Sequence, residues 1–93
     1  MSAAVSEEIV PRAEIAMMGI AMEVKLRLHD ADGRREDMPV AFFHLRLKEE
    51  IEELVEACFH GTAHDALLEA ADVANFAMMI WMVKREMERF RKG

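Results

Sequence analysis

The chain has 93 residues, which is enough for one domain and too few for a second hydrophobic core. Apolar residues make up 53% of it and charged residues 32%, which excludes intrinsic disorder and collagen-like repeats. The single cysteine, Cys58, excludes an intramolecular disulfide and favours a reducing compartment, so we expect a cytoplasmic protein. The longest apolar run, 76–83, is far shorter than the ~20 residues that span a bilayer, so we expect no membrane partner.

The net charge of −6 argues against a nucleic-acid partner, and the charge is unevenly distributed. The segment 49–72 holds eight acidic residues and no lysine or arginine. It contributes −8, while the other 69 residues sum to +2. From Lys84 onward the chain is predominantly basic. This pattern indicates a cation site and an anion site in one molecule, although a solvated helix face gives a similar count.

The chain is expected to form helices only, because no segment alternates polar and apolar residues as a half-buried strand does. The first helix is predicted over 12–29, and the polar segment 29–37 is predicted to be a loop. A second helix is predicted over 39–59, with Asp37 as its N-cap. Gly61 ends it, since glycine is the usual residue just past a helix C-terminus.

A third helix is predicted over 62–89, because Thr62 and Asp65 resemble a capping box with a shorter acid. The fold class is therefore expected to be all-α, with three helices per chain. The whole chain, 1–93, would be a single helical domain whose ends, 1–10 and 90–93, are flexible.

The predicted third helix is apolar on nearly every face between residues 66 and 83. Its polar residues there are Glu69, Asp72 and Asn75, spaced by three. Such a helix belongs in the middle of a structure, which one short chain cannot build around it. We therefore expect a homodimer or homotetramer that completes a four-helix-bundle-type core. Trp81 and Cys58 are expected at core positions. The second helix adds an apolar stripe of Leu47, Ile51, Leu54, Val55 and Cys58.

Two pairs of acidic residues have the spacing that places both carboxylates on one helix face: Glu50 with Glu53, and Glu69 with Asp72. Carboxylates on an apolar helix are costly unless they are paired or bound to metal, and no lysine or arginine lies between Lys48 and Lys84 to pair with the second of these pairs. If the second and third helices pack antiparallel, the two pairs face each other. Repulsion would then raise their pKa values, and a hard cation, Mg²⁺ or Mn²⁺, would relieve it.

The sequence Glu49-Glu50-x-x-Glu53, followed after fifteen residues by Glu69-x-x-Asp72, resembles the signature of the all-α NTP pyrophosphohydrolases, the MazG-like superfamily. The resemblance covers residues 22–83 and includes the Ala-Asp-Val-Ala-Asn-Phe stretch at 71–76. It implies a Mg²⁺-dependent enzyme that hydrolyses a (deoxy)nucleoside triphosphate to the monophosphate and pyrophosphate. The role would be nucleotide-pool control or removal of a non-standard nucleotide.

The same resemblance implies a role for each acid of the signature. Glu49 would orient or deprotonate the attacking water, as a general base does. Metal ions that bridge phosphate oxygens neutralise the substrate's charge. The implied metal ligands are Glu50, Glu53, Glu69 and Asp72.

Four further residues are candidates for substrate binding, each with a simpler alternative. Lys25 matches a family position and could meet phosphates, or it is a surface lysine. Arg46 could contact phosphate, or pair with Glu50 one turn later. The resemblance places Asn75 in the substrate pocket. Lys84 could reach the triphosphate, but a positive charge near a helix C-terminus is expected anyway.

Two alternatives to this function stay open. Phosphoribosyl-ATP pyrophosphohydrolase is a neighbour within the superfamily, and it ranks lower because Asn75-Phe76 stands where that enzyme tends to have Tyr-His. A non-catalytic helical interaction module is the alternative from another class, with its acidic pairs satisfied across an interface.

The loop at 32–35 departs from the family pattern. It lacks the Gly-Trp pair of many compact relatives, which leaves no aromatic residue there to stack on a base.

Overall fold

The computed structural model describes residues 9–31 and 40–92, and all of their regular structure is helical. The helices are α2 (Ala13–Ala31), α3 (Val40–His60) and α4 (Ala63–Lys92). No strand occurs in this part of the chain. The all-α prediction is therefore confirmed for the described residues.

The helix boundaries differ slightly from those predicted. α2 continues two residues past His29, and α4 continues three residues past Arg89. Neither extension contains glycine or proline, so the backbone hydrogen bonds continue into it. The expected cap Asp37, most of the expected loop and the terminal residues 1–8 and 93 lie outside the described residues.

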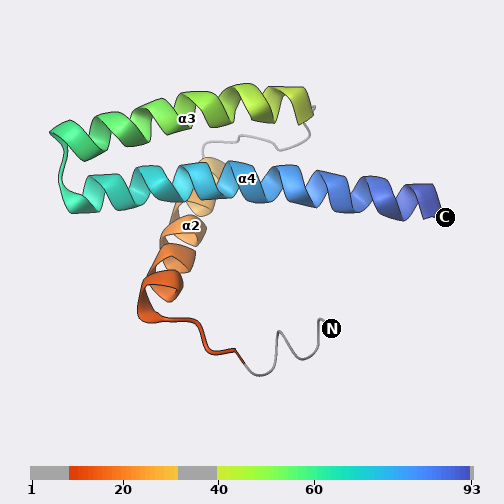
Figure 1. Ribbon diagram of the computed structural model, residues 1–93, viewed down its shortest axis with the longest axis horizontal. Helices are drawn as coiled ribbons and strands as arrows, with labels where there is room; N and C mark the ends of the chain where they lie inside the picture. Colours follow the sequence, from red (N-terminus) through yellow and green to blue (C-terminus); the bar gives the residue numbers. More distant parts are fainter. Residues whose placement is uncertain (1–8, 32–39, 93) are drawn as a thin grey trace.

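α4 is the central helix, and it packs against both α3 and α2. α3 and α4 lie side by side as an antiparallel hairpin, whereas α2 crosses behind α4 at a steep angle (Figure 1). The C-terminal part of α4 extends beyond the N-terminal end of α3 (Figure 1). Two different faces of α4 are therefore available to meet side chains from the other helices.

The turn between α3 and α4 is held by the predicted capping box. The Thr62 backbone N–H donates to Asp65 Oδ2 at 2.9 Å, and the Asp65 backbone N–H donates to Thr62 Oγ1 at 3.1 Å. A Cβ atom at Gly61 would lie 2.9 Å from Asp65 Oδ2 and 3.0 Å from the carbonyl oxygen of Ala57. Only glycine fits such a close approach without a shift of its neighbours. The tight turn brings the acidic residues of the two helices level with each other.

The core lies where the helices meet, and it is small. Its buried apolar residues include Ala21 on α2, Phe43 on α3, and Ala71 and Phe76 on α4. The rings of Phe43 and Phe76 lie 6.2 Å apart with a tilt of 54°, a favourable arrangement for two aromatic side chains. Small alanines among these residues allow the helix backbones to approach closely.

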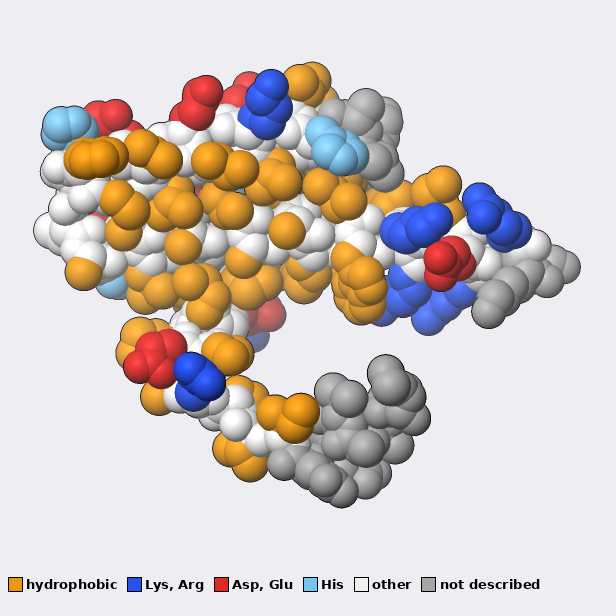
Figure 2. Space-filling model, in the orientation of Figure 1, with side chains coloured by type: hydrophobic (Ala, Val, Ile, Leu, Met, Phe, Trp, Pro, Cys, Tyr) orange, Lys and Arg blue, Asp and Glu red, His pale blue; other side chains and the backbone are white. Residues whose placement is uncertain are grey.

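Much of the apolar surface of α3 and α4 is uncovered. Ile51 is 45% exposed, Val55 49% and Trp81 57%. The predictions that Trp81 and Cys58 lie in the core are therefore wrong for the single chain, in which both are exposed. Hydrophobic side chains spread over α3 and α4 on the face toward the viewer, and α2 lies behind (Figure 2). The reason is geometric, since α2 covers only one side of the hairpin.

By length and composition alone, α4 could also cross a membrane over Ala63–Arg91. The central helix of a soluble bundle has the same composition, because it too is surrounded by apolar side chains. α4 carries Glu69 and Asp72 within this stretch, and acidic side chains are costly in a bilayer.

Candidate metal centre

Three carboxylates converge between α3 and α4. Oxygen atoms of Glu50, Glu69 and Asp72 lie within 4.8 Å of one another. Glu50 comes from α3 and the other two from successive turns of α4, so the antiparallel hairpin brings together residues from both acidic pairs. Glu50 is 4% exposed and Asp72 6% exposed, whereas Glu69 is half-buried.

Two of these carboxylates have cationic partners. Lys25 Nζ on α2 lies 3.2 Å from Asp72 Oδ2, and Arg46 Nη2 lies 3.0 Å from Glu50 Oε2. Arg46 also pairs with Glu49. The sequence offered Asp72 no local cation, and the structure supplies one from a helix that is distant in the chain. Two roles were predicted for Arg46, a phosphate contact or an ion pair with Glu50 one turn later, and the structure shows the ion pair.

Two oxygen atoms of the cluster remain buried with no hydrogen-bond partner among the described residues, Glu69 Oε1 and Asp72 Oδ1. A buried polar atom without a partner costs about 1–3 kcal/mol, so such atoms in a folded protein call for an explanation. Carboxylate oxygens are the ligands that Mg²⁺ and Mn²⁺ prefer. The donor set and its unpaired oxygens therefore fit a hard divalent cation.

The electrostatics of the cluster favour the neutral forms of two of its acids. Burial raises the pKa of Glu50 to about 7, with the charges of Glu53 and Asp72 adding to the effect and Arg46 opposing it. Burial likewise raises the pKa of Glu69, again with help from the charges of Asp72 and Glu53, while Lys25 opposes it. A cation bound between these groups would remove the repulsion.

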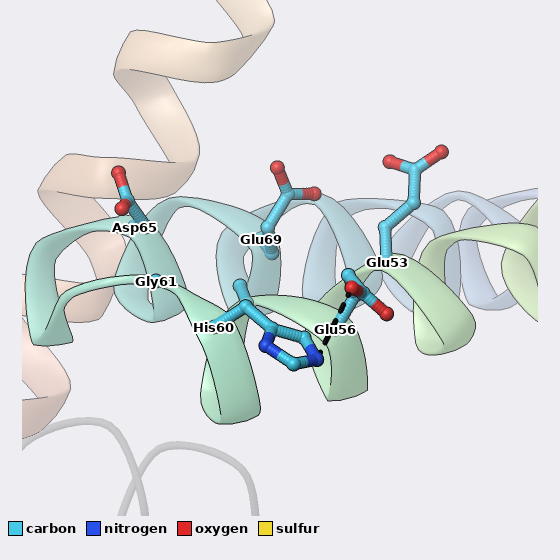
Figure 3. A pocket seen from close by; sticks show the side chains of 7 residues that line it. Glu53, Glu56, His60, Gly61, Asp65 and Glu69 are labelled. Atoms are coloured by element: carbon cyan, nitrogen blue, oxygen red, sulfur yellow. Dashed lines mark ion pairs between the residues drawn. The ribbon is translucent and has the colours of Figure 1, made fainter.

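Glu53 lies at the edge of the cluster. Its side chain is exposed, and its oxygens are not among those that converge with Glu50, Glu69 and Asp72. It lines an open pocket of about 400 Å³ next to the α3–α4 turn. In that pocket the carboxylates of Glu53, Asp65 and Glu69 point to the same side (Figure 3). Glu53 therefore lies on the solvent side of the predicted ligand set.

The opposite side of the same pocket carries an ion pair. His60 Nε2 lies 3.5 Å from Glu56 Oε2, and both side chains are largely exposed (Figure 3). An exposed pair of this kind contributes little to stability.

The other predicted site residues divide into two groups. Glu49 lies beside the cluster, exposed and paired with Arg46. Asn75 is 2% exposed and one turn beyond Asp72; its Nδ2 donates to the carbonyl oxygen of Met22 at 3.0 Å, and its Oδ1 has no partner among the described residues. Lys84 is not brought to the cluster, since it follows Asp72 by twelve positions in α4, a rise of about 18 Å along the helix.

Sequence reasoning did not find two aromatic contacts of arginine. The guanidinium of Arg46 lies 5.4 Å from the centre of the Phe76 ring. The arginine that pairs with Glu50 therefore also contacts an aromatic residue of the core. The guanidinium of Arg85 lies 4.7 Å from the centre of the Trp81 ring. The i, i+4 spacing of Trp81 and Arg85 was a local signal for the second contact, whereas the first required the packing of α3 on α4.

A second groove, of about 350 Å³, lies where α2, α3 and α4 meet beyond the cluster. It is mostly apolar, with Glu23 and Asp30 as its acidic residues. The remaining lining residues are Leu26, Phe43, Met78, Met79, Met82 and Val83.

Comparisons of the chain with protein families, with curated proteins and with solved structures found no match.

Proposed function

We propose that the protein is a Mg²⁺-dependent nucleoside triphosphate pyrophosphohydrolase of the MazG-like kind. The observation that carries this proposal is the convergence of Glu50, Glu69 and Asp72, with buried, unpaired oxygens on the last two. The spacing of the acidic signature adds to it. Together they favour a divalent cation as the partner of the cluster and a polyphosphate as its substrate.

In the proposed reaction, water attacks the α-phosphorus and the bond to the bridging α–β oxygen breaks. The products are the monophosphate, pyrophosphate and one proton. Glu50, Glu69 and Asp72 would hold the cation, and Glu53 would complete the set from the pocket edge. When bound, the cation neutralises the charge of the phosphate oxygens.

The remaining residues act around that centre. Glu49 is exposed and adjacent to the cluster, so it can accept the proton of the attacking water. Asn75 has an unpaired but buried amide oxygen one turn beyond Asp72, and this oxygen would accept a hydrogen bond from substrate only if substrate binding exposes it. Lys84 would contact the triphosphate only if a second copy brings it close, because α4 separates it from the cluster of its own chain.

We also propose that the chain works in the cytoplasm as a homodimer or homotetramer. The exposed apolar side chains of Ile51, Val55 and Trp81 support this, because water-exposed apolar surface of this extent is usually covered by a partner. A second hairpin packed on the uncovered face would complete a four-helix bundle.

The test of the reaction is phosphorus NMR of the protein with Mg²⁺ and each common ribo- and deoxyribonucleoside triphosphate, in water enriched in ¹⁸O. We expect monophosphate plus pyrophosphate, with the ¹⁸O label in the monophosphate. Glu50→Gln should abolish the reaction, whereas Glu52→Gln, an exposed neighbour, should retain it. Diphosphate plus orthophosphate would contradict the proposed bond. No turnover and no Mg²⁺ binding would favour a non-catalytic interaction module.

A further inference from the structure

Lys25 forms a protected ion pair with the cluster. Its Nζ lies 3.2 Å from Asp72 Oδ2, and the two side chains are only 19% and 8% exposed. Lys25 belongs to α2, which crosses α4, so the contact is made by tertiary packing. The Coulomb attraction between two charges shielded from water in this way is stronger than between charges at the surface.

The charges around the cluster show what this pair does. Three carboxylates converge, and Lys25 and Arg46 are the cations that pair with them among the described residues. Arg46 is shared between Glu49 and Glu50. Lys25 is therefore the counter-ion on the α4 side of the cluster, where Glu69 and Asp72 still have unpaired buried oxygens.

An ammonium group and a divalent cation compete for such a position. Mg²⁺ needs several oxygen ligands at about 2.0–2.1 Å, and a positive charge beside one of them opposes its binding. The lysine stem is long and flexible, so Nζ can move by several ångströms while the helix stays in place. A phosphate group next to the cation would give the displaced ammonium a new anionic partner.

We propose that Lys25 is an internal counter-ion that neutralises Asp72 in the metal-free protein and moves to a phosphate group when a divalent cation binds. This inference rests on the proposed function. It couples the two binding events, because the cation releases the ammonium that the phosphate needs. Such coupling is reciprocal, so phosphate binding strengthens cation binding equally. Lys25 is thus a positioning residue for the charges of the site.

The test compares Mg²⁺ binding by calorimetry in the wild type, Lys25→Met and Arg27→Met. Methionine keeps an unbranched stem of similar length without the charge. Arg27 is the matched control, because it lies on the same helix in an exposed pair with Glu23. We expect Lys25→Met to bind Mg²⁺ about tenfold more tightly than the wild type, and Arg27→Met to stay within about twofold of it.

The second arm measures the binding of inorganic tripolyphosphate in the presence of excess Mg²⁺. Lys25→Met should bind tripolyphosphate about tenfold more weakly than the wild type does. A merely structural role for Lys25 would weaken both ligands. Equal Mg²⁺ affinity in the wild type and Lys25→Met would overturn the counter-ion role while leaving the metal site intact. Absence of Mg²⁺ binding in all three proteins would overturn the metal site, and this inference with it.

A measurement on the wild type is independent of how the variant folds. The chain has four lysines, Lys25, Lys48, Lys84 and Lys92, so their side-chain ammonium signals can be separated by ¹⁵N NMR. The Lys25 signal should shift on addition of Mg²⁺, and the signal of the exposed Lys48 should stay in place. A Lys25 signal that does not respond to saturating Mg²⁺ would overturn the displacement.

Discussion

The side-chain amide of Asn75 donates a hydrogen bond to the backbone carbonyl oxygen of Met22, with 3.0 Å between Nδ2 and the oxygen. The contact joins α4 to α2 and is almost fully shielded from water, since Asn75 is 2% exposed. Lys25 follows Met22 by three residues and Asp72 precedes Asn75 by three, which is about one turn in each helix. The contact therefore fixes the rotation of α2 about its axis and its position along α4, and thereby the place at which Lys25 meets Asp72.

Asn75→Ala is expected to lower the free energy of unfolding by about 1–3 kcal/mol, because it removes this buried hydrogen bond and leaves a gap. Urea denaturation in the absence of metal measures the loss. Glu86→Ala is the control, as it removes an exposed ion pair with Arg89 on the same helix and should change stability by less than about 1 kcal/mol. Equal stability of Asn75→Ala and the wild type would show that the contact contributes nothing.

The stability of the metal-free protein is expected to fall as the pH rises from about 4.5 to 7. The pKa of Glu50 is about 7 in the folded chain, against its ordinary value of 4.5. Within this window the folded state keeps a proton that the unfolded state releases, so a rise in pH favours unfolding. Thermal midpoints in the presence of a chelator should therefore decrease over this range and level off above it.

Glu50→Gln should make this pH dependence shallower, because glutamine does not titrate. Glu52→Gln, a change at an exposed position of α3, should leave the pH profile as in the wild type. A flat wild-type profile between pH 5 and 7 would contradict the raised pKa of Glu50.

Addition of Mg²⁺ at neutral pH is expected to raise the thermal midpoint by several degrees, because a ligand that binds only the folded state stabilises it. Asp72→Asn should lose most of this shift, since it removes one charge and one strong ligand from the cluster. Differential scanning fluorimetry measures both. If Asp72→Asn keeps the full shift, the cation is bound elsewhere.

Thr62→Ala is expected to destabilise the protein by about 0.5–2 kcal/mol, because it removes the hydroxyl that accepts the Asp65 N–H at the start of α4. Thr62→Ser keeps the hydroxyl and is the matched control. The bond from the Thr62 backbone N–H lowers the pKa of Asp65, so this part of the stability is lost as the pH falls through that lowered value. Urea denaturation of the two variants should separate them.

Self-association is expected to be visible through Trp81, the single tryptophan, which is 57% exposed in the isolated chain. Its emission should shift to shorter wavelength as the protein concentration rises, and sedimentation should report a larger species. Val55→Asp should keep the protein monomeric by adding a charge to the apolar face, whereas Glu56→Gln should associate like the wild type. A wild-type monomer at high concentration would contradict the oligomer.

The amino-acid sequence by itself determined the local features of this protein. The capping box of Thr62 and Asp65 and the glycine before it involve residues within one turn, so their pattern predicts the turn between the two helices directly. The i, i+3 spacing of Glu69 and Asp72 likewise placed both carboxylates on one side of α4 before any packing was known.

Only the tertiary structure decided which side chains meet. Glu53 has the same spacing from Glu50 as Asp72 has from Glu69, yet its side chain is exposed and its oxygens are not among the converging ones. The pair of Lys25 with Asp72 depends on how α2 crosses α4, and the exposure of Trp81 depends on α2 covering one side only. Crossing angle and rotation result from many weak packing contacts between distant residues, and no short sequence pattern encodes them.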